Sequence, residues 1–289
     1  MPYATARDGT KLYVKEMGQG RPVVLIHGWP LNADSWDAVA VPLAEAGNRV
    51  IAYDRRGFGR SDQPWDGYDY DTFADDLRTV LEEFDLRDNV ALVGFSMGGG
   101  EVARYLSRHG ADGIDRVALI GSIVPYMLKT DDNPDGVPQD VFDGMEKQMR
   151  DDRAAFFQTF FRSFYGVGMI SQPVSNAVIE HSFQMAMLAG LRPTLAAAGA
   201  FASTDFRSDL AAFSVPTLII HGTADQTVPI DTSARAAARG IPGSTLIEYD
   251  GSAHGLIESD RERLTSDLLA FLGGGSAMPQ LGATRETAY

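Results

Sequence analysis

A serine between two glycines has the most specific chemical signature in this sequence. Ser96 lies in the pentapeptide Gly-Phe-Ser-Met-Gly, after the apolar run 90–93 and before an apolar-patterned segment that starts at 101. This order predicts a strand, a sharp turn and a helix, and glycines flank the turn because a Cβ there would collide with neighbouring elements. The pattern predicts that Ser96 is the nucleophile of a serine hydrolase. A serine that caps a helix in a glycine-rich turn is the simpler alternative.

The base that a serine hydroxyl needs is most often a histidine, and the chain has five. His27 and His221 each end an expected strand before a glycine, where a structural imidazole is the expected role. His109 ends the helix after the serine, where the helix dipole favours a cation. His181 falls in the middle segment. His254 lies in a glycine-flanked loop after the last expected strand and can reach over the serine turn, so it is the predicted base.

The acid that orients this base should leave a loop at the carboxyl end of another strand. Asp225 does so, because it follows the apolar run 217–220 after a short loop. Asp250 is the alternative, but it closes the strand that leads to His254 and suits a turn. The order Ser96, Asp225, His254 is the serine, acid, histidine order of α/β-hydrolases.

Two backbone N–H groups are needed to hold the oxyanion of a tetrahedral intermediate. The N–H of Met97, directly after the nucleophile, is the first expected donor. The second should come from the loop after the run 23–26, most naturally from Trp29. Pro30 has no N–H and constrains Trp29 to an extended conformation, which would fix the direction of the Trp29 carbonyl.

Continuous apolar runs predict the strands that position these residues. Strands are expected at 23–26, 50–53, 90–93, 117–120, 217–220 and 245–249, and the continuous apolar run at 23–26 is typical of a strand covered on both faces. Residues 3–17 alternate weakly around an Asp-Gly turn and predict two short antiparallel strands. Amphipathic helices between the strands, one of them capped by Asp71, complete an α/β fold with a mostly parallel eight-stranded sheet and helices on both faces.

The middle of the chain departs from this alternation. Residues 123–207 lack strand runs and are rich in aromatic residues and methionine, which predicts a helical cap inserted over the active site. The predicted core is therefore 1–122 and 208–272. Residues 273–289 form a tail that opens with a glycine-rich linker and has no helical or strand period.

Large apolar side chains are expected to line the substrate pocket. We expect Phe142, Phe157 and Phe161 to contribute from the cap. Pro30 and Val228 are the expected contributions from the core. The phenylalanines of the cap form a helical stripe that can also hold the cap to the sheet, and we expect this stripe to do both.

Composition argues against several classes of function. The net charge of −14 argues against nucleic acid or an anionic membrane surface as partner. The absence of cysteine excludes disulfides, thiolate catalysis and iron–sulfur ligation. The start has no apolar core of signal-peptide length and no run of 18 apolar residues occurs, which predicts a soluble, cytoplasmic protein. The tail is a candidate for docking against a neighbouring subunit, and we expect a homo-oligomer.

Four segments carry a resemblance to a known family. They are His-Gly-Trp-Pro at 27–30, Tyr-Asp-Arg-Arg-Gly-Phe-Gly at 53–59, Gly-Phe-Ser-Met-Gly at 94–98 and Val-Ala-Arg-Tyr at 102–105. They resemble the cofactor-free (non-haem) bacterial haloperoxidases, a branch of the α/β-hydrolase superfamily with aryl-esterase, perhydrolase and γ-lactamase relatives. Two cap segments, 131–138 and 141–144, resemble the same branch, so the similarity extends over residues 3–272.

This resemblance implies the same triad and the same two oxyanion donors, and a reaction without metal or other cofactor. Members form an acyl-serine and release it to water or to hydrogen peroxide, and the resulting peracid oxidises halide. A proline after the oxyanion-loop aromatic, here Pro30, is linked to peroxide use. The expected function is a serine carboxylic-ester hydrolase with perhydrolase activity on a small-molecule ester or carboxylic acid. A lactamase or lactonase on the same triad, and a ligand-sensing relative without catalysis, are the alternatives.

Overall fold

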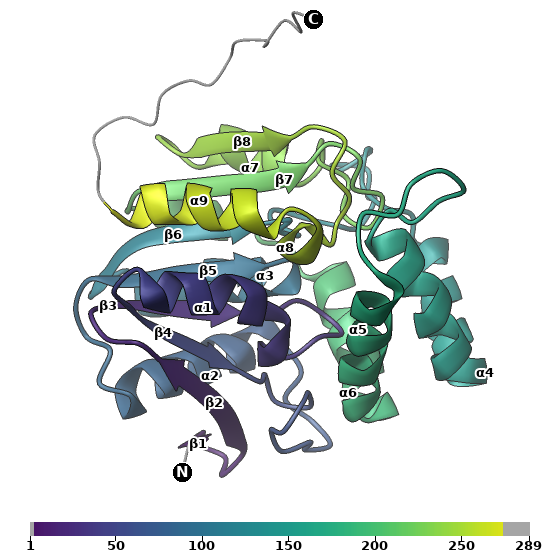
Figure 1. The fold of residues 1–289 in the computed structure, drawn as a ribbon. Helices are drawn as coiled ribbons and strands as arrows, with labels where there is room; N and C mark the ends of the chain where they lie inside the picture. Colours follow the sequence, from purple (N-terminus) through teal and green to yellow (C-terminus); the bar gives the residue numbers. More distant parts are fainter. Residues whose placement is uncertain (1–2, 274–289) are drawn as a thin grey trace, which may run out of the picture.

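The computed structural model describes residues 3–273, and it shows a sheet between two layers of helices with further helices at one end of the strands (Figure 1). The strands are β1 (Tyr3–Thr5), β2 (Lys11–Met17), β3 (Arg21–Ile26), β4 (Asn48–Tyr53), β5 (Val90–Phe95), β6 (Ile114–Ile120), β7 (Thr217–Gly222) and β8 (Thr245–Tyr249). The helices are α1 (Asp37–Glu45), α2 (Tyr70–Glu83), α3 (Met97–His109), α4 (Gln139–Phe164), α5 (Asn176–Leu188), α6 (Leu191–Ser203), α7 (Ala234–Gly240), α8 (Leu256–Ser259) and α9 (Arg261–Leu272), with 3₁₀ turns at Ala33–Trp36 and Asp209–Ala212. Apart from residue 273, the predicted tail lies outside the described residues.

The strands form one eight-stranded sheet in the order β1-β2-β4-β3-β5-β6-β7-β8. β2 is antiparallel to both β1 and β4, and the remaining neighbours are parallel. The mostly parallel sheet and the antiparallel N-terminal pair are therefore confirmed. Ile26 is opposite both Tyr53 and Gly94, and Phe95 is opposite Ile120. This register brings the carboxyl ends of the central strands level, so the loops that follow them meet at one edge of the sheet.

Helices cover both faces of the sheet. α1, α8 and α9 pack on one face and α2, α3 and α7 on the other (Figure 1). α2 buries an apolar stripe that includes Phe73, Leu77 and Val80, at the spacing expected for a helix with one covered face. Its cap is Asp69 rather than the expected Asp71: the side chain of Asp69 accepts a hydrogen bond from the N–H of Thr72 at 2.9 Å. The helix therefore starts two residues earlier than a cap at Asp71 predicts, and its first residue, Tyr70, is buried.

Three helices, α4, α5 and α6, lie at the carboxyl end of the strands (Figure 1). All three fall within the segment predicted as a cap, whose boundaries stay a prediction. α4 is broken at Asp152, where the backbone leaves helical geometry (φ −156°, ψ 91°). Within residues 3–273 no single helix is both long and apolar enough for a membrane span; α5 and α6 reach that measure only as a pair, and the chain bends by 101° between them.

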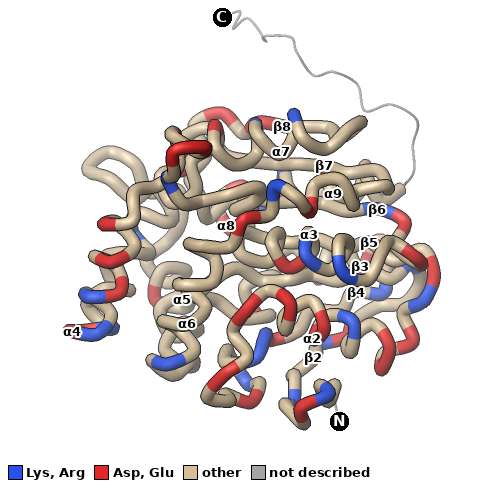
Figure 2. Tube along the Cα trace, turned by 180° about the vertical axis from the view of Figure 1, so that it is seen from behind, with Lys and Arg blue, Asp and Glu red and all other residues tan. Residues whose placement is uncertain are grey.

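Acidic and basic side chains are interspersed over the helices rather than separated. Figure 2 shows them alternating along α4 and around α2. Several are paired across elements, as where Arg108 of α3 binds Asp75 of α2 at 2.8 Å. Such exposed pairs each contribute little to stability. The surface over α2 and α4 therefore presents mixed charge despite the net charge of −14.

Candidate active site

The turn between β5 and α3 holds Ser96 in a conformation that few non-glycine residues adopt. Its φ of +53° and ψ of −118° lie outside the favoured regions, a strain that functional sites often retain. A Cβ on Gly94 would lie 2.6 Å from the carbonyl oxygen of Gly98, and one on Gly98 would lie 2.4 Å from that of Ile26. Both glycines are therefore required by close backbone contacts, and the predicted strand, turn and helix are all present.

Three side chains from distant loops form a continuous hydrogen-bonded chain at this turn. The Oγ of Ser96 is 2.9 Å from Nε2 of His254. Nδ1 of His254 donates to Oδ2 of Asp225 at 2.6 Å. The other oxygen, Oδ1, accepts the backbone N–H groups of Thr227 at 2.9 Å and Val228 at 2.8 Å. The structure thus brings together the three residues that the sequence singled out, in the order that base catalysis at the serine needs.

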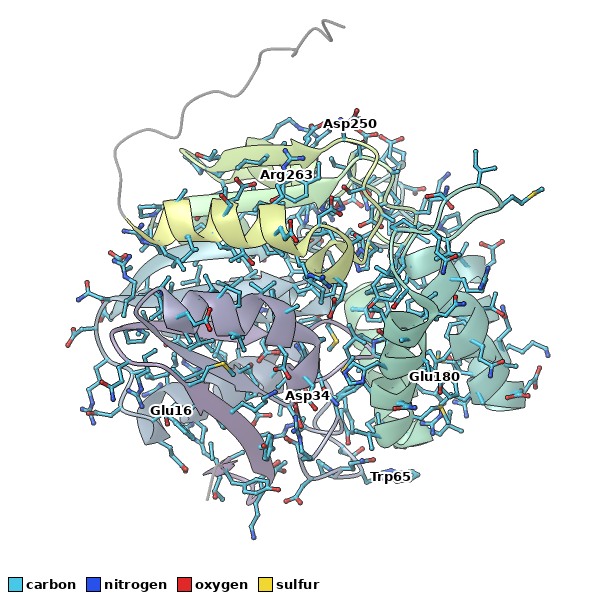
Figure 3. The ribbon with its side chains drawn as sticks, in the orientation of Figure 1. Glu16, Asp34, Trp65, Glu180, Asp250 and Arg263 are labelled. Carbon is cyan, nitrogen blue, oxygen red and sulfur yellow. The ribbon has the colours of Figure 1, made fainter. Side chains whose placement is uncertain are left out.

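Asp250, the alternative acid, is exposed at the end of β8 and lies at the surface (Figure 3). Its Oδ1 accepts a hydrogen bond from the hydroxyl of Thr223 at 3.2 Å, which fits the turn role expected for it.

The carboxylate of Asp225 is held ionised although it is buried. Burial alone would raise the pKa of Asp225, but the charge of His254 and hydrogen bonds from His221 and His254 keep it well below its usual range. The imidazole of His254 is enclosed by the rings of Phe95 at 5.2 Å and Phe164 at 4.9 Å, measured between centroids. The carboxylate of Asp225 can therefore accept a hydrogen bond from Nδ1–H of His254 and stabilise the positively charged imidazole that forms during the reaction.

The two expected oxyanion donors are both available. In the part of the chain that the structure describes, the backbone N–H groups of Trp29 and Met97 have no hydrogen-bond acceptor. The loop that carries Trp29 comes very close to the nucleophile, since a Cβ on Gly28 would lie 2.9 Å from the Cβ of Ser96. Unpaired N–H groups beside a nucleophile can hold a developing oxyanion.

Buried polar groups fix this oxyanion loop. Nδ1 of His27 donates to the carbonyl of Gly28 at 2.9 Å, and its Nε2 accepts the N–H of Arg55 at 2.9 Å. Burial and then the nearby charge of Arg55 lower the pKa of His27 well below its usual value, so it is neutral. The guanidinium of Arg55 also binds Glu101 of α3 at 2.7 Å. His27 has the structural role that the sequence predicts.

A cavity of about 190 Å³ opens over the nucleophile. It is lined by Trp29, Ser96, Ile123, Met127, Val137, Val141, Phe142, Met145, Phe160, Ser163, Phe201, Gln226, Thr227, Val228 and His254. Phe142 and Val228 are thus placed as the sequence suggested, and most of the remaining wall is apolar. Such a lining suits the apolar part of a small molecule, with the reacting group at the serine.

Three of the expected pocket residues, Pro30, Phe157 and Phe161, do not belong to the lining of this cavity. Phe157 and Phe161 are completely buried. They lie one helical turn apart on α4, near Phe160, and Phe160 is the one of the three that lines the cavity. Phe157 instead packs on the indole of Trp29, with ring centroids 5.6 Å apart. Pro30 is buried in the same turn as Trp29.

Several lining residues were missed from the sequence, and some carried a usable signal. Met145 follows Val141 by four residues and Phe142 by three, so it is a neighbour of both on the surface of α4. Gln226 and Thr227 directly follow the acid. Ile123 and Met127, which come shortly after β6, lie at the same sheet edge as the other strand ends. Phe160, Ser163 and Phe201 reach the cavity only through the packing of α4 against α6, which no local pattern reveals.

No group of three His, Cys, Asp or Glu side chains within residues 3–273 is arranged to hold a metal ion. The residues around Ser96 are those of acyl transfer: a hydroxyl, an imidazole, a carboxylate and two N–H donors. They can form and break an ester on the serine.

Comparisons with known proteins show the family to which this chain belongs. The family model described as "alpha/beta hydrolase fold" matches residues 21–260. A non-heme chloroperoxidase of Kitasatospora aureofaciens is 45% identical over 94% of this chain and 99% of that protein. A bifunctional esterase/perhydrolase of Acinetobacter calcoaceticus is 39% identical, again over 94% of this chain and 99% of that protein. The crystal structure of a bromoperoxidase from Bacillus anthracis superposes with a TM-score of 0.90 at 43% identity, covering 94% of this chain and 99% of that one.

Proposed function

This chain belongs to the α/β-hydrolase family, and we propose that it is a serine carboxylic-ester hydrolase that also transfers acyl groups to hydrogen peroxide. The observation that carries the proposal is the hydrogen-bonded chain from Ser96 through His254 to Asp225, under an apolar cavity and beside two free N–H groups. The relatives named as a chloroperoxidase and an esterase/perhydrolase support the peroxide reaction.

In the first half of the reaction Ser96 becomes acylated. Nε2 of His254 takes the hydroxyl proton as Oγ forms a bond to the ester carbonyl carbon, and the carbonyl oxygen gains the negative charge. The N–H groups of Trp29 and Met97 hold that oxyanion. When the tetrahedral intermediate collapses, the bond to the alcohol oxygen breaks and His254 returns the proton to the leaving alcohol.

In the second half a small nucleophile releases the acyl group. Water or hydrogen peroxide gives its proton to His254 and attacks the acyl carbon, and Ser96 leaves and recovers the proton. Water yields a carboxylic acid and hydrogen peroxide yields a peracid. A peracid, bromide and one proton then give the carboxylic acid and hypobromous acid, a two-electron oxidation that takes place in solution.

The cavity points to short acyl groups. Its volume of about 190 Å³ is below the roughly 300–1,000 Å³ of pockets for drug-sized ligands, so it suits a small group. Polar lining comes from Ser163, Gln226 and Thr227, beside the triad. We therefore propose small acyl or aryl esters, and short carboxylic acids with peroxide, as the substrate class.

Two variants test the proposal. Ser96→Ala should abolish turnover of a p-nitrophenyl ester and also the bromination of a reporter dye by acetate, bromide and hydrogen peroxide, because both reactions use one nucleophile. Pro30→Leu should lower bromination more than ester hydrolysis, because the residue after Trp29 is linked to peroxide use. Retained turnover in Ser96→Ala contradicts the assignment, and equal loss of both activities in Pro30→Leu removes the special role of that proline.

The alternatives have their own measurements. A lactamase or lactonase would use the same triad, so turnover of lactams and lactones relative to open esters decides that case. A ligand sensor would show slow turnover and a ligand-dependent change in partner binding. The homo-oligomer stays a prediction that size-exclusion chromatography with light scattering tests, and the cytoplasmic location stays a prediction for cell fractionation.

A further inference from the structure

A second histidine touches the acid of the triad. His221 ends β7 and is completely buried. Its Nε2 lies 2.8 Å from the carbonyl oxygen of Val228 and 3.1 Å from Oδ2 of Asp225. Both neighbours are acceptors, so Nε2 must carry a proton.

The other ring nitrogen settles the tautomer. Nδ1 of His221 has no hydrogen-bond partner among residues 3–273. A second proton there would be a buried donor without an acceptor, which is costly. The geometry therefore favours a single proton on Nε2. His27, the comparable histidine at the end of β3, differs because both its nitrogens are paired and neither touches the triad.

His221, Val228 and Asp225 close a ring of hydrogen bonds. Val228 donates its N–H to Oδ1 of Asp225 at 2.8 Å and accepts the Nε2 proton of His221 on its carbonyl oxygen. Oδ2 of Asp225, which lies near the same proton, is also the oxygen that His254 contacts at 2.6 Å. Two imidazoles thus converge on one carboxylate oxygen.

We propose that His221 is a positioning residue of the triad: its Nε2 proton ties the carboxylate of Asp225 to the carbonyl of Val228 and keeps Oδ2 where His254 needs it. This rests on the proposed function, since it assigns a role toward the same triad. His221 does not line the cavity and does not touch a substrate there. It acts through Asp225, and its effect should appear in the rate per active site.

Few charged side chains lie near His221 and His254 among the described residues. Glu248 of β8 is opposite His221 in the sheet and is itself bound to Arg235 of α7 at 2.6 Å. Around His254, β5 and α4 contribute the rings of Phe95 and Phe164. Asp225 is therefore the charged group that contacts both imidazoles. A donor on Oδ2 shares the carboxylate charge that would otherwise act on His254 alone.

Three variants separate the hydrogen bond from packing. His221→Leu fills the site without a donor, whereas His221→Gln keeps an amide N–H group that can reach the position of Nε2. Tyr249→Phe is the matched control: it removes one partly buried hydrogen bond, to Asp267 at 2.6 Å, from the neighbouring strand β8, and this bond does not involve the triad. If His221→Leu gives no soluble protein, His221→Asn replaces it, because the shorter amide cannot reach either acceptor.

The readouts are the number of active sites, the rate per site and its pH dependence. Competent sites are counted by labelling the serine with a fluorophosphonate, and kcat for a p-nitrophenyl ester is divided by that count. His221→Leu should lower the rate per site on the order of 10- to 100-fold, as a small displacement of a catalytic group does. Its kcat/KM profile against pH should also differ from that of the wild type, because Oδ2 of Asp225 has one donor fewer. His221→Gln should recover most of the rate, and Tyr249→Phe should match the wild type.

Two results would overturn this role. In one, His221→Leu loses labelled sites while the rate per site and the pH profile stay as in the wild type, which is a purely structural effect. In the other, His221→Gln is as slow per site as His221→Leu, which assigns the effect to shape rather than to the donor. Failure of the wild type to hydrolyse the ester or to take the label contradicts the proposed function instead, so the two failures are distinguishable.

Discussion

Replacing Asp225 by asparagine tests the assignment of the triad acid, which in the sequence depended only on the order of the three residues and on the position of Asp225 after a strand. The carboxylate now accepts at both oxygens, from two backbone N–H groups at Oδ1 and from His254 at Oδ2. An asparagine must turn its NH₂ group toward one of these sets of donors. If it faces His254, the imidazole must present Nδ1 as an acceptor, which places the proton on Nε2 and leaves no base for Ser96.

The expected loss follows from the charge that disappears. A serine triad that loses its carboxylate falls on the order of 10³- to 10⁴-fold in kcat, because the tautomer is wrong and the imidazolium is no longer stabilised. That corresponds to about 4–5.5 kcal/mol of transition-state stabilisation. The assay is kcat for a p-nitrophenyl ester at pH 7 to 8, with thermal unfolding to show that the variant is folded.

Asp250→Asn is the matched control for this experiment. It removes a carboxylate from the same region of the chain, but from an exposed side chain that contacts only the hydroxyl of Thr223 among its described hydrogen-bond partners. Its kcat should stay within about twofold of the wild type, as is usual for a surface substitution. A folded Asp225→Asn with more than a tenth of wild-type kcat, or a larger loss in Asp250→Asn, would refute the reasoning.

Three further predictions follow from packing and electrostatics. Gly98→Ala should lower the free energy of unfolding by about 3 kcal/mol or more in urea titrations, because the new Cβ would lie 2.4 Å from the carbonyl oxygen of Ile26 in the central sheet. Gly144→Ala is the control, since no neighbouring atom of the described residues lies within 4 Å of its new Cβ, and it should raise the free energy of unfolding by about 0.5–1 kcal/mol. Equal effects of the two substitutions would contradict the close contact at Gly98. The pKa of Asp225 is held well below its usual range, so its carboxylate stabilises the fold above about pH 4 and this contribution is lost as the pH falls further. The difference in unfolding free energy between the wild type and Asp225→Asn should therefore shrink from pH 5 to pH 3. A difference that stays constant over this range would contradict the lowered pKa. Phe160→Ala should enlarge the cavity and shift the preferred acyl chain to longer esters, whereas an unchanged chain-length profile would show that this ring does not limit the substrate.

Much of the site was predictable because its residues follow strand ends. Apolar runs locate the strands, and in a parallel sheet the carboxyl ends meet at one edge, so Ser96, Asp225 and His254 could be expected to converge. The strained turn at Ser96 was predictable for a related reason. Its flanking glycines leave a local pattern, and the backbone contacts at Gly94 and Gly98 explain why that pattern is needed.

The pocket was less predictable because it depends on how helices rotate and pack. Phe157, Phe160 and Phe161 are near neighbours of the same type on α4, and only the docking of the cap decides that Phe160 faces the cavity. The role of His221 was also hidden, since a histidine before glycine at a strand end has the same local sequence as His27. The difference is the loop 225–228, which folds back so that Val228 and Asp225 both reach His221.

The most direct test of the account is to find the acyl group on the protein. The enzyme is mixed with a p-nitrophenyl ester, quenched with acid within milliseconds to seconds, digested and analysed by mass spectrometry. We predict one acyl adduct, on the peptide that contains Ser96, which disappears faster with hydrogen peroxide present than in water alone. An adduct on another residue, or full ester turnover by Ser96→Ala, would contradict the account.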